Sequence, residues 1–195
     1  MPRVFPEYKD EAKNKIIAAA IEAAGEKGFS KVKMGDVAKR LGISRSTLYI
    51  YFKDKEELIR EILAYIRVSM INRVNESLKE KKLQEAFSAI FNGFIYSDEF
   101  YFGGGVVFEV ISETEHNEKI RELVKEHYIV LGEAIANLLK FQQNIGKISK
   151  DIDADTAART IQALTIGLKA SSLIGLKKEQ ALLIWEGTIK KILDL

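Results

Sequence analysis

Apolar and polar positions follow the period of an α-helix along most of this chain. Between Lys9 and Lys27, isoleucines and alanines recur three and four residues apart, which places them on one helical face. Further helices are expected over the ranges with similar spacing: Met34–Leu41, Lys55–Leu78, Leu83–Tyr96, Asn117–Phe141, Ala154–Ile174 and Lys178–Leu193. No segment keeps the period of two that marks a half-buried strand, so the predicted fold class is all-α.

The clearest local signal lies in residues 37–52, where two short helices are expected on either side of a tight turn. Ala38 is small, so a second helix can pass close above it. Gly42 follows four residues later, where a left-handed turn costs glycine nothing. Leu48 comes six residues after that, on the buried side of the second helix. This spacing predicts a helix-turn-helix, whose second helix enters the major groove of DNA.

The first turn of that second helix would present its side chains to base edges. Ser44 is a good N-cap, since its hydroxyl can accept from the amide of Ser46 or Thr47. Arg45 is placed either to read a guanine through its two acceptors or to contact a phosphate. Ser46 and Thr47 can touch base or backbone. We therefore predict DNA contacts from Ser44, Arg45, Ser46 and Thr47.

The formal net charge is only +2, but the charge is unevenly distributed. Residues 1–67 carry 14 Lys and Arg against 10 Asp and Glu, whereas residues 68–195 carry 16 against 18. Between Lys33 and Lys55 there are six basic residues and two acidic ones. Positive charge thus gathers around the motif, as phosphate contact requires. A solvated surface with chance asymmetry is the alternative.

The composition offers little to an enzyme. Cysteine is absent and there are two histidines, so no catalytic residue, metal site or cofactor is predicted. Residues 113–116 spell Glu-x-x-His, half of a di-iron motif, but no second copy exists. No apolar run approaches eighteen residues and no signal-peptide pattern occurs, so we expect a cytoplasmic protein without a membrane partner. The remaining alternatives to a DNA-binding protein are a helical enzyme and a purely structural helical protein.

The segment from Val32 to Leu58 resembles the amino-terminal signature of the TetR family of transcription regulators. The matching runs are Asp36-Val37-Ala38, Leu41-Gly42-Ile43-Ser44, Thr47-Leu48-Tyr49, Tyr51-Phe52 and Lys55-Glu56-Glu57-Leu58. The resemblance implies a helix-turn-helix DNA-binding domain over residues 1–53 and an effector-binding and dimerisation domain over residues 54–195, with a helix over 55–78 connecting them. It implies three partners: double-stranded operator DNA, a small-molecule effector and a second copy of the chain. Most relatives act as repressors that the effector releases.

The resemblance also extends the set of DNA contacts. Tyr49 and Tyr51 resemble the family's backbone-contacting tyrosines, although Tyr51 is equally placed for core packing. Lys55 begins a long helix, where its ammonium and the free amides would bind a phosphate. The family often has a threonine that caps the first motif helix. This chain has Lys33 in that stretch, so the cap would be lost and Lys33 would reach a phosphate by charge.

Eight of the eighteen aromatic residues fall within residues 87–108. Helical spacing alone makes Phe87, Phe91 and Phe94 ordinary core residues. The resemblance implies that these helices enclose an effector pocket, and an aromatic pocket suits a hydrophobic or planar molecule. Glu109 would either face a cationic effector or point to solvent. The predicted effector contacts are Phe87, Phe91, Phe94, Phe102, Phe108, Glu109, Tyr128 and Leu131.

The last two expected helices are apolar on more than one face, and such helices need more than one packing partner. The resemblance implies a four-helix bundle formed by two subunits, and intramolecular packing alone is the alternative. The predicted residues of the dimer interface are Ile161, Leu164, Leu168, Trp185 and Ile189.

Overall fold

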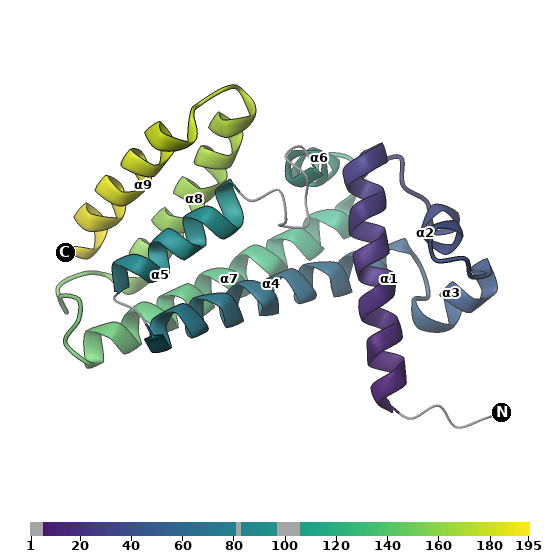
Figure 1. The fold of residues 1–195 in the computed structure, drawn as a ribbon, viewed down its shortest axis with the longest axis horizontal. Helices are drawn as coiled ribbons and strands as arrows, with labels where there is room; N and C mark the ends of the chain where they lie inside the picture. Colours follow the sequence, from purple (N-terminus) through teal and green to yellow (C-terminus); the bar gives the residue numbers. More distant parts are fainter. Residues whose placement is uncertain (1–5, 81–82, 97–105) are drawn as a thin grey trace. The chain divides into compact units, whose positions relative to one another are not determined.

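The structure is a computed structural model, and it describes residues 6–80, 83–96 and 106–195. No strand occurs in these ranges, which confirms the all-α prediction. None of the described helices is long and apolar enough to cross a membrane. The elements labelled in Figure 1 and the short turn η1 are α1 (Pro6–Lys27), α2 (Met34–Arg40), α3 (Arg45–Tyr51), α4 (Lys55–Glu80), α5 (Leu83–Ile90), η1 (Phe91–Ile95), α6 (Val106–Glu113), α7 (Glu118–Asn144), α8 (Ala154–Leu173) and α9 (Lys178–Leu193).

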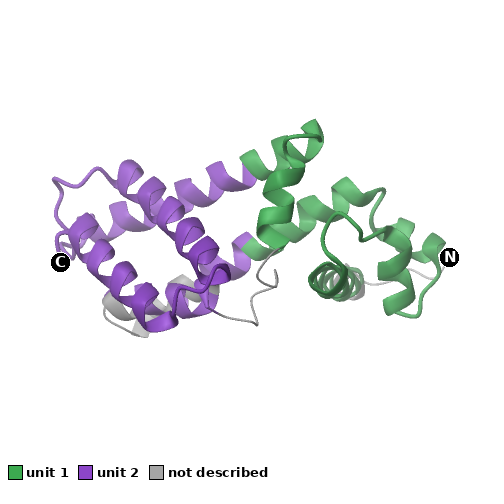
Figure 2. Ribbon diagram, turned by 90° about the horizontal axis from the view of Figure 1, so that it is seen from above, with its two compact units in different colours: residues 1–66, 101–125 green, residues 67–100, 126–195 purple. Residues whose placement is uncertain are grey.

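The helices group into two compact units (Figure 2). Unit 1 comprises residues 1–66 and 101–125, and unit 2 comprises residues 67–100 and 126–195. Helices α4 and α7 each contribute residues to both units. The predicted boundary between residues 53 and 54 separates a DNA-binding role from an effector-binding role, whereas the two units are defined by contacts within the chain. The predicted functional boundary therefore stays a prediction.

The core of unit 1 holds the motif helices in place. Val37 on α2, Leu48 on α3 and Phe52 just after α3 have no exposed surface. Burying side chains of this kind stabilises a fold by about 1.5–3 kcal/mol each. Residues of α1 and of the first turns of α4 are buried in the same unit: Ile16, Ile17, Ala20, Ile21, Leu58, Ile59 and Ile62.

Charged side chains join α2 to α1. The guanidinium of Arg40 donates to both carboxylate oxygens of Glu26, at 2.8 Å each, and to Glu22 at 2.9 Å. The hydrogen bonds from Arg40 lower the pKa of the Glu26 carboxyl. A carboxyl whose pKa is lower in the folded chain stabilises the fold above its unfolded pKa, and this stabilisation is lost as pH falls through the folded pKa. The pairing therefore strengthens unit 1 at neutral pH and weakens in acid.

Unit 2 is built around the single tryptophan of the chain. Trp185 on α9 is completely buried and packs in one apolar cluster with Phe87 and Phe91. Its indole Nε1 donates to the backbone carbonyl of Phe87 at 3.0 Å. A buried carbonyl needs such a partner, so this bond fixes α5 against α9 as well as satisfying the oxygen.

The helix expected over Leu83–Tyr96 is present over Leu83–Ile95, but its second half is π-helical rather than α-helical. The α-helix ends at Ile90 and continues as the π-helical turn η1, where the amide of Tyr96 donates to the carbonyl of Phe91 five residues earlier. The phenol of Tyr96 also donates to the carbonyl of Leu176 at 2.6 Å. This tertiary bond accompanies the wider turn, and a local pattern could not have revealed it.

Replacing Trp185 with phenylalanine is expected to lower the free energy of unfolding by about 1–3 kcal/mol, because the buried carbonyl of Phe87 loses its indole donor. Urea unfolding followed by far-ultraviolet circular dichroism measures this change. The control is Ile145→Ala, at a half-exposed side chain in the loop after α7, where we expect a change within about 0.5 kcal/mol. Equal stability of the Trp185→Phe variant and the parent would show that the indole bond contributes nothing.

Candidate nucleic-acid interface

Helix α3 begins where the sequence predicted. The hydroxyl of Ser44 accepts a hydrogen bond from the amide of Thr47 at 3.0 Å, so Ser44 is the N-cap. Gly42 has a φ of +65°, which lets the chain turn between α2 and α3. Leu48 is fully enclosed and anchors α3 in the core of unit 1. The predicted helix-turn-helix geometry is confirmed for residues 34–51.

Burial of Leu48 turns most of the predicted DNA contacts on α3 toward the surface. Tyr49 exposes half of its surface, and Thr47 and Tyr51 are half-buried beside the core. Sequence reasoning did not single out Ile50, whose side chain is 73% exposed. The available signal was its position two residues after the buried Leu48, on the opposite side of the helix. The exposed members of the predicted set at this helix are Ser44, Arg45, Ser46 and Tyr49.

The guanidinium of Arg45 lies over the backbone of Gly35 on α2. A methyl group at Gly35 would come within 2.7 Å of both Nε and Nη2 of Arg45. The glycine lowers the helix propensity of α2 by up to about 1 kcal/mol relative to alanine. The close approach of Arg45 gives this glycine a structural reason. In this conformation Arg45 lies along the surface between α2 and α3, at an exposed position.

Lys33 is exposed just before α2, and its side chain does not cap that helix. Asp36 takes over part of the missing cap, because its carboxylate accepts from the backbone amide of Lys33 at 2.9 Å. The same carboxylate accepts from the ammonium of Lys27 at 2.7 Å, and this bond lowers the pKa of Asp36. The side chain of Lys33 therefore has no part in closing α2, and its exposed position suits the predicted phosphate contact.

Two of the six basic residues around the motif are engaged within the chain. Arg40 is paired with glutamates of α1, so its charge adds little to an outward positive surface. Arg40 and Lys55 are the two that are engaged, and the other four, Lys33, Lys39, Arg45 and Lys53, are exposed.

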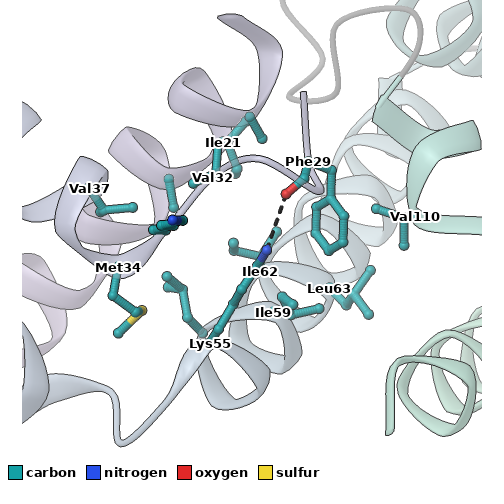
Figure 3. A pocket seen from close by; sticks show the side chains of 14 residues that line it. Ile21, Phe29, Val32, Met34, Val37, Lys55, Ile59, Ile62, Leu63 and Val110 are labelled. Carbon is teal, nitrogen blue, oxygen red and sulfur yellow. Dashed lines mark hydrogen bonds between the residues drawn. The ribbon is translucent and has the colours of Figure 1, made fainter. Parts of the chain in front are cut away.

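The ammonium of Lys55 points into unit 1 (Figure 3). Its Nζ donates to the backbone carbonyl of Phe29 at 3.2 Å and lies 4.9 Å from the centre of the Phe29 ring. Desolvation lowers the pKa of Lys55, while the nearby charges of Glu113 and Glu56 oppose that shift. The predicted phosphate contact of Lys55 therefore requires the side chain to leave this position.

The amides at the start of α4 are also less available than predicted. The carboxylate of Asp54 accepts from the amide of Glu57 at 2.8 Å, and the carboxylate of Glu57 accepts from the amide of Lys53. Through these two bonds Asp54 and Glu57 cap the start of α4. This capping places two carboxylates where the prediction expected free donors for a phosphate, so α4 does not offer an open anion site in this structure.

A small apolar cavity of about 40 Å³ lies beside Lys55 in unit 1 (Figure 3). Its walls come from α1, from the loop before α2, from α2 itself, from α4 and from Val110 of α6. None of the predicted effector residues lines it. On α6, the carboxylate of Glu109 lies against Gly28, where a methyl group would come within 2.9 Å of Oε2. The predicted exposure of Glu109 to solvent was thus only partly right, because its side chain is half-buried beside this turn.

The remaining predicted effector residues fall in different places. Phe87 and Phe91 are buried in the core of unit 2, as their helical spacing alone suggested. Tyr128 and Leu131 are half-buried on the part of α7 that belongs to unit 2, and Phe108 is half-buried on α6 of unit 1. The side chain of Phe94 and all of Phe102 lie outside the described residues. A common effector pocket stays a prediction.

The predicted dimer contacts are mostly buried within their own chain. Ile161, Leu168, Trp185 and Ile189 are at most 4% exposed and belong to the core cluster of unit 2. Leu164 packs against that cluster and is half-buried. The amphipathic pattern identified apolar positions correctly, but four of the five have no surface left for a second subunit. The exposed large apolar side chains of α8, α9 and their connection are Leu173, Ile174, Leu183 and Ile184.

Comparison with known proteins agrees with this geometry. The family profile of bacterial regulatory proteins of the tetR family matches residues 16–62, which include α2 and α3. The HTH-type transcriptional regulator UidR of Escherichia coli K12 is 26% identical over 158 residues, covering 81% of this chain and 80% of UidR. The enzyme alternative is set aside by these matches to transcriptional regulators.

Two solved structures share the fold. GusR of Salmonella enterica superposes with a TM-score of 0.76 at 23% identity, with all of both chains covered. The SmeT–triclosan complex superposes with a TM-score of 0.71 at 14% identity, covering 92% of this chain and 90% of SmeT. Taken together with the capped and outward-facing helix α3, these matches show that residues 16–62 form a helix-turn-helix domain of the tetR-family type, in a chain that is similar to transcriptional regulators over most of its length.

Proposed function

We propose that this regulator binds operator DNA as a homodimer, represses transcription and is released by a hydrophobic or aromatic small molecule. The orientation of α3 is the observation that supports the proposed binding to DNA. Leu48 holds the helix from the inside, while Arg45, Ser46 and Tyr49 are exposed. A helix that begins at an N-cap and shows its first turn to solvent is suited to the major groove.

In this proposal, Arg45 leaves the surface of Gly35 and reaches a guanine or a phosphate. The residue next to the guanidinium is Gly35, which has no side chain. Arg45 can therefore move away from it without breaking a contact between side chains. Tyr49 and Lys33 contact the phosphate backbone from exposed positions, and Ser46 and Thr47 contact base or backbone. Tyr51 is half-buried, which keeps core packing open as its role.

The DNA-binding part is tested by selecting preferred duplexes from a random pool and measuring binding of an Arg45→Ala variant. If Arg45 reads guanine, we expect a loss of about 1–3 kcal/mol on the selected duplex and relaxed selection at one base pair in each half-site. Lys150→Ala is the control, because Lys150 is exposed in the loop before α8. A uniform loss on all duplexes would assign Arg45 to phosphate, and the absence of any preferred duplex would contradict the proposed function.

Lys55 is given a second role that depends on DNA. In the free protein its ammonium holds the Phe29 carbonyl, and on DNA it would turn outward to a phosphate. We expect Lys55→Met to make the slope of log K against log salt concentration shallower by about 0.9 per subunit, because one phosphate contact is lost. Lys150→Gln should leave the slope unchanged. A slope unaltered by Lys55→Met would confine Lys55 to its internal contact with Phe29.

The effector part rests on the family and on the aromatic residues of unit 2. SmeT, which shares the fold, is seen in complex with triclosan. A comparable effector here would bind near Tyr128 and Leu131, which are half-buried on α7. Helix α4 contributes to both units, so a ligand that displaces it would alter the separation of the two α3 helices in a dimer. A tenfold loss of DNA affinity needs only about 1.4 kcal/mol of coupling.

For the homodimer we propose a face formed by the exposed apolar residues of α8, α9 and their connection. Leu183 is 73% exposed and Ile174 is 88% exposed, although both are large and apolar. Exposed apolar residues gathered on neighbouring elements are typical of protein interfaces. A second copy of the chain is the occupant that the family resemblance implies. Leu164 is half-buried and can contribute its remaining surface.

Leu183→Arg is expected to give monomers in light scattering, because the substitution would bury a charge in an apolar interface. Ile129→Arg is the control, since Ile129 is exposed on α7 and belongs to neither α8 nor α9. Because Leu183 is exposed within one chain, the variant should keep its helical circular dichroism. A dimer that persists in the Leu183→Arg variant would place the interface elsewhere.

A further inference from the structure

The packing of unit 1 gives no reason for the large apolar side chain of Ile50 on α3. Its side chain is 73% exposed, more than that of Tyr49 in the same helix. The DNA contacts predicted from the sequence include its neighbours on both sides but not Ile50 itself. A large apolar side chain in water adds little to stability, because the hydrophobic effect rewards only area that is removed from water.

The direction of Ile50 follows from the burial of Leu48. Successive residues of an α-helix are rotated by about 100°, so residues two positions apart are rotated by about 200°. Ser46 and Ile50 each lie two positions from the fully enclosed Leu48, one before it and one after it. They also lie four positions apart, which stacks them on one face. Ser46 and Ile50 therefore form the ridge of α3 that points most directly away from the core.

This ridge combines one hydroxyl with one branched apolar group. Ser46 is exposed, and its hydroxyl lies 2.7 Å from that of Ser44. If α3 enters the major groove, the ridge is the part that faces the base edges. Among the groups that base pairs present there, the C5-methyl of thymine is the apolar one, and the others are hydrogen-bond donors and acceptors. An isoleucine at this position would leave such polar groups unpaired but would pack well against a methyl group.

We propose that Ile50 is a specificity-determining residue that reads the 5-methyl group of a thymine in each operator half-site. The proposal rests on the proposed function, since it requires α3 to bind in the major groove. It adds a base identity that the polar residues of α3 do not supply. Ser46, one turn earlier on the same ridge, would contact the adjacent position.

The test removes only the methyl group from the DNA. Each thymine of a duplex selected from a random pool is replaced in turn by deoxyuridine, which keeps Watson–Crick pairing and the donor and acceptor pattern. With the parent protein, we expect one position in each half-site at which deoxyuridine weakens binding about fourfold, the equivalent of roughly 0.8 kcal/mol for one buried methyl-sized group. Fluorescence anisotropy at fixed salt measures this change.

The Ile50→Ala variant assigns the effect to this side chain. It should bind the thymine duplex more weakly than the parent does, and it should bind the thymine and deoxyuridine duplexes about equally. Because Ile50 is exposed, the variant should keep the parent's circular dichroism. Ile129→Ala removes an exposed isoleucine from α7 and should keep the fourfold difference.

The outcomes separate this inference from the proposed function. A selected duplex that is insensitive to deoxyuridine at every position would overturn the role of Ile50 and leave DNA binding intact. Sensitivity that persists in the Ile50→Ala variant would assign the methyl contact to another residue and would also overturn it. The absence of any selected duplex would overturn both the inference and the function on which it rests.

Discussion

The enclosure of Leu48 is the constraint on which the DNA-binding face depends. A helix of seven residues is effectively rigid, so fixing the direction of one side chain fixes the direction of all the others. Leu48 sets the rotation of α3 about its axis, and the bond from the Thr47 amide to the Ser44 hydroxyl sets the residue at which the helix begins. Together they decide that Arg45, Ser46, Tyr49 and Ile50 are presented to solvent.

The charge available for DNA differs from the charge counted in the sequence. Arg40 is held by Glu26 and Glu22, and the ammonium of Lys55 lies against the carbonyl of Phe29. These cations hold unit 1 together, with Arg40 linking α2 to α1 and Lys55 linking α4 to the turn after α1. Some basic residues around the motif thus make contacts within unit 1, and the others remain exposed. Because most of a protein's affinity for the DNA backbone comes from exposed cations, that division matters more than the net charge.

In unit 2 the amphipathic pattern correctly predicted which residues are buried, but it did not identify the surface that buries them. The pattern placed apolar residues such as Trp185 and Ile161 on buried faces, and both are buried. It could not state whether the burying surface belongs to the same chain or to a second subunit, because both surfaces require the same residue types. The aromatic residues Phe87 and Phe91 raise the same ambiguity between a core and a ligand pocket, and here they pack with Trp185.

Local sequence patterns were enough to predict the helical fold class, most helix boundaries, the N-cap at Ser44 and the resemblance of residues 32–58 to the TetR signature. These features depend on residues within a few positions of one another, since periodicity and capping involve neighbours along the chain. The tertiary structure alone decided that Arg45 lies over Gly35, that Lys55 turns inward to Phe29 and that Trp185 donates to Phe87. Each of these contacts joins different helices or loops, from 10 to 98 residues apart in the chain. Where a side chain goes depends on which distant backbone the fold brings beside it, and no local pattern contains that information.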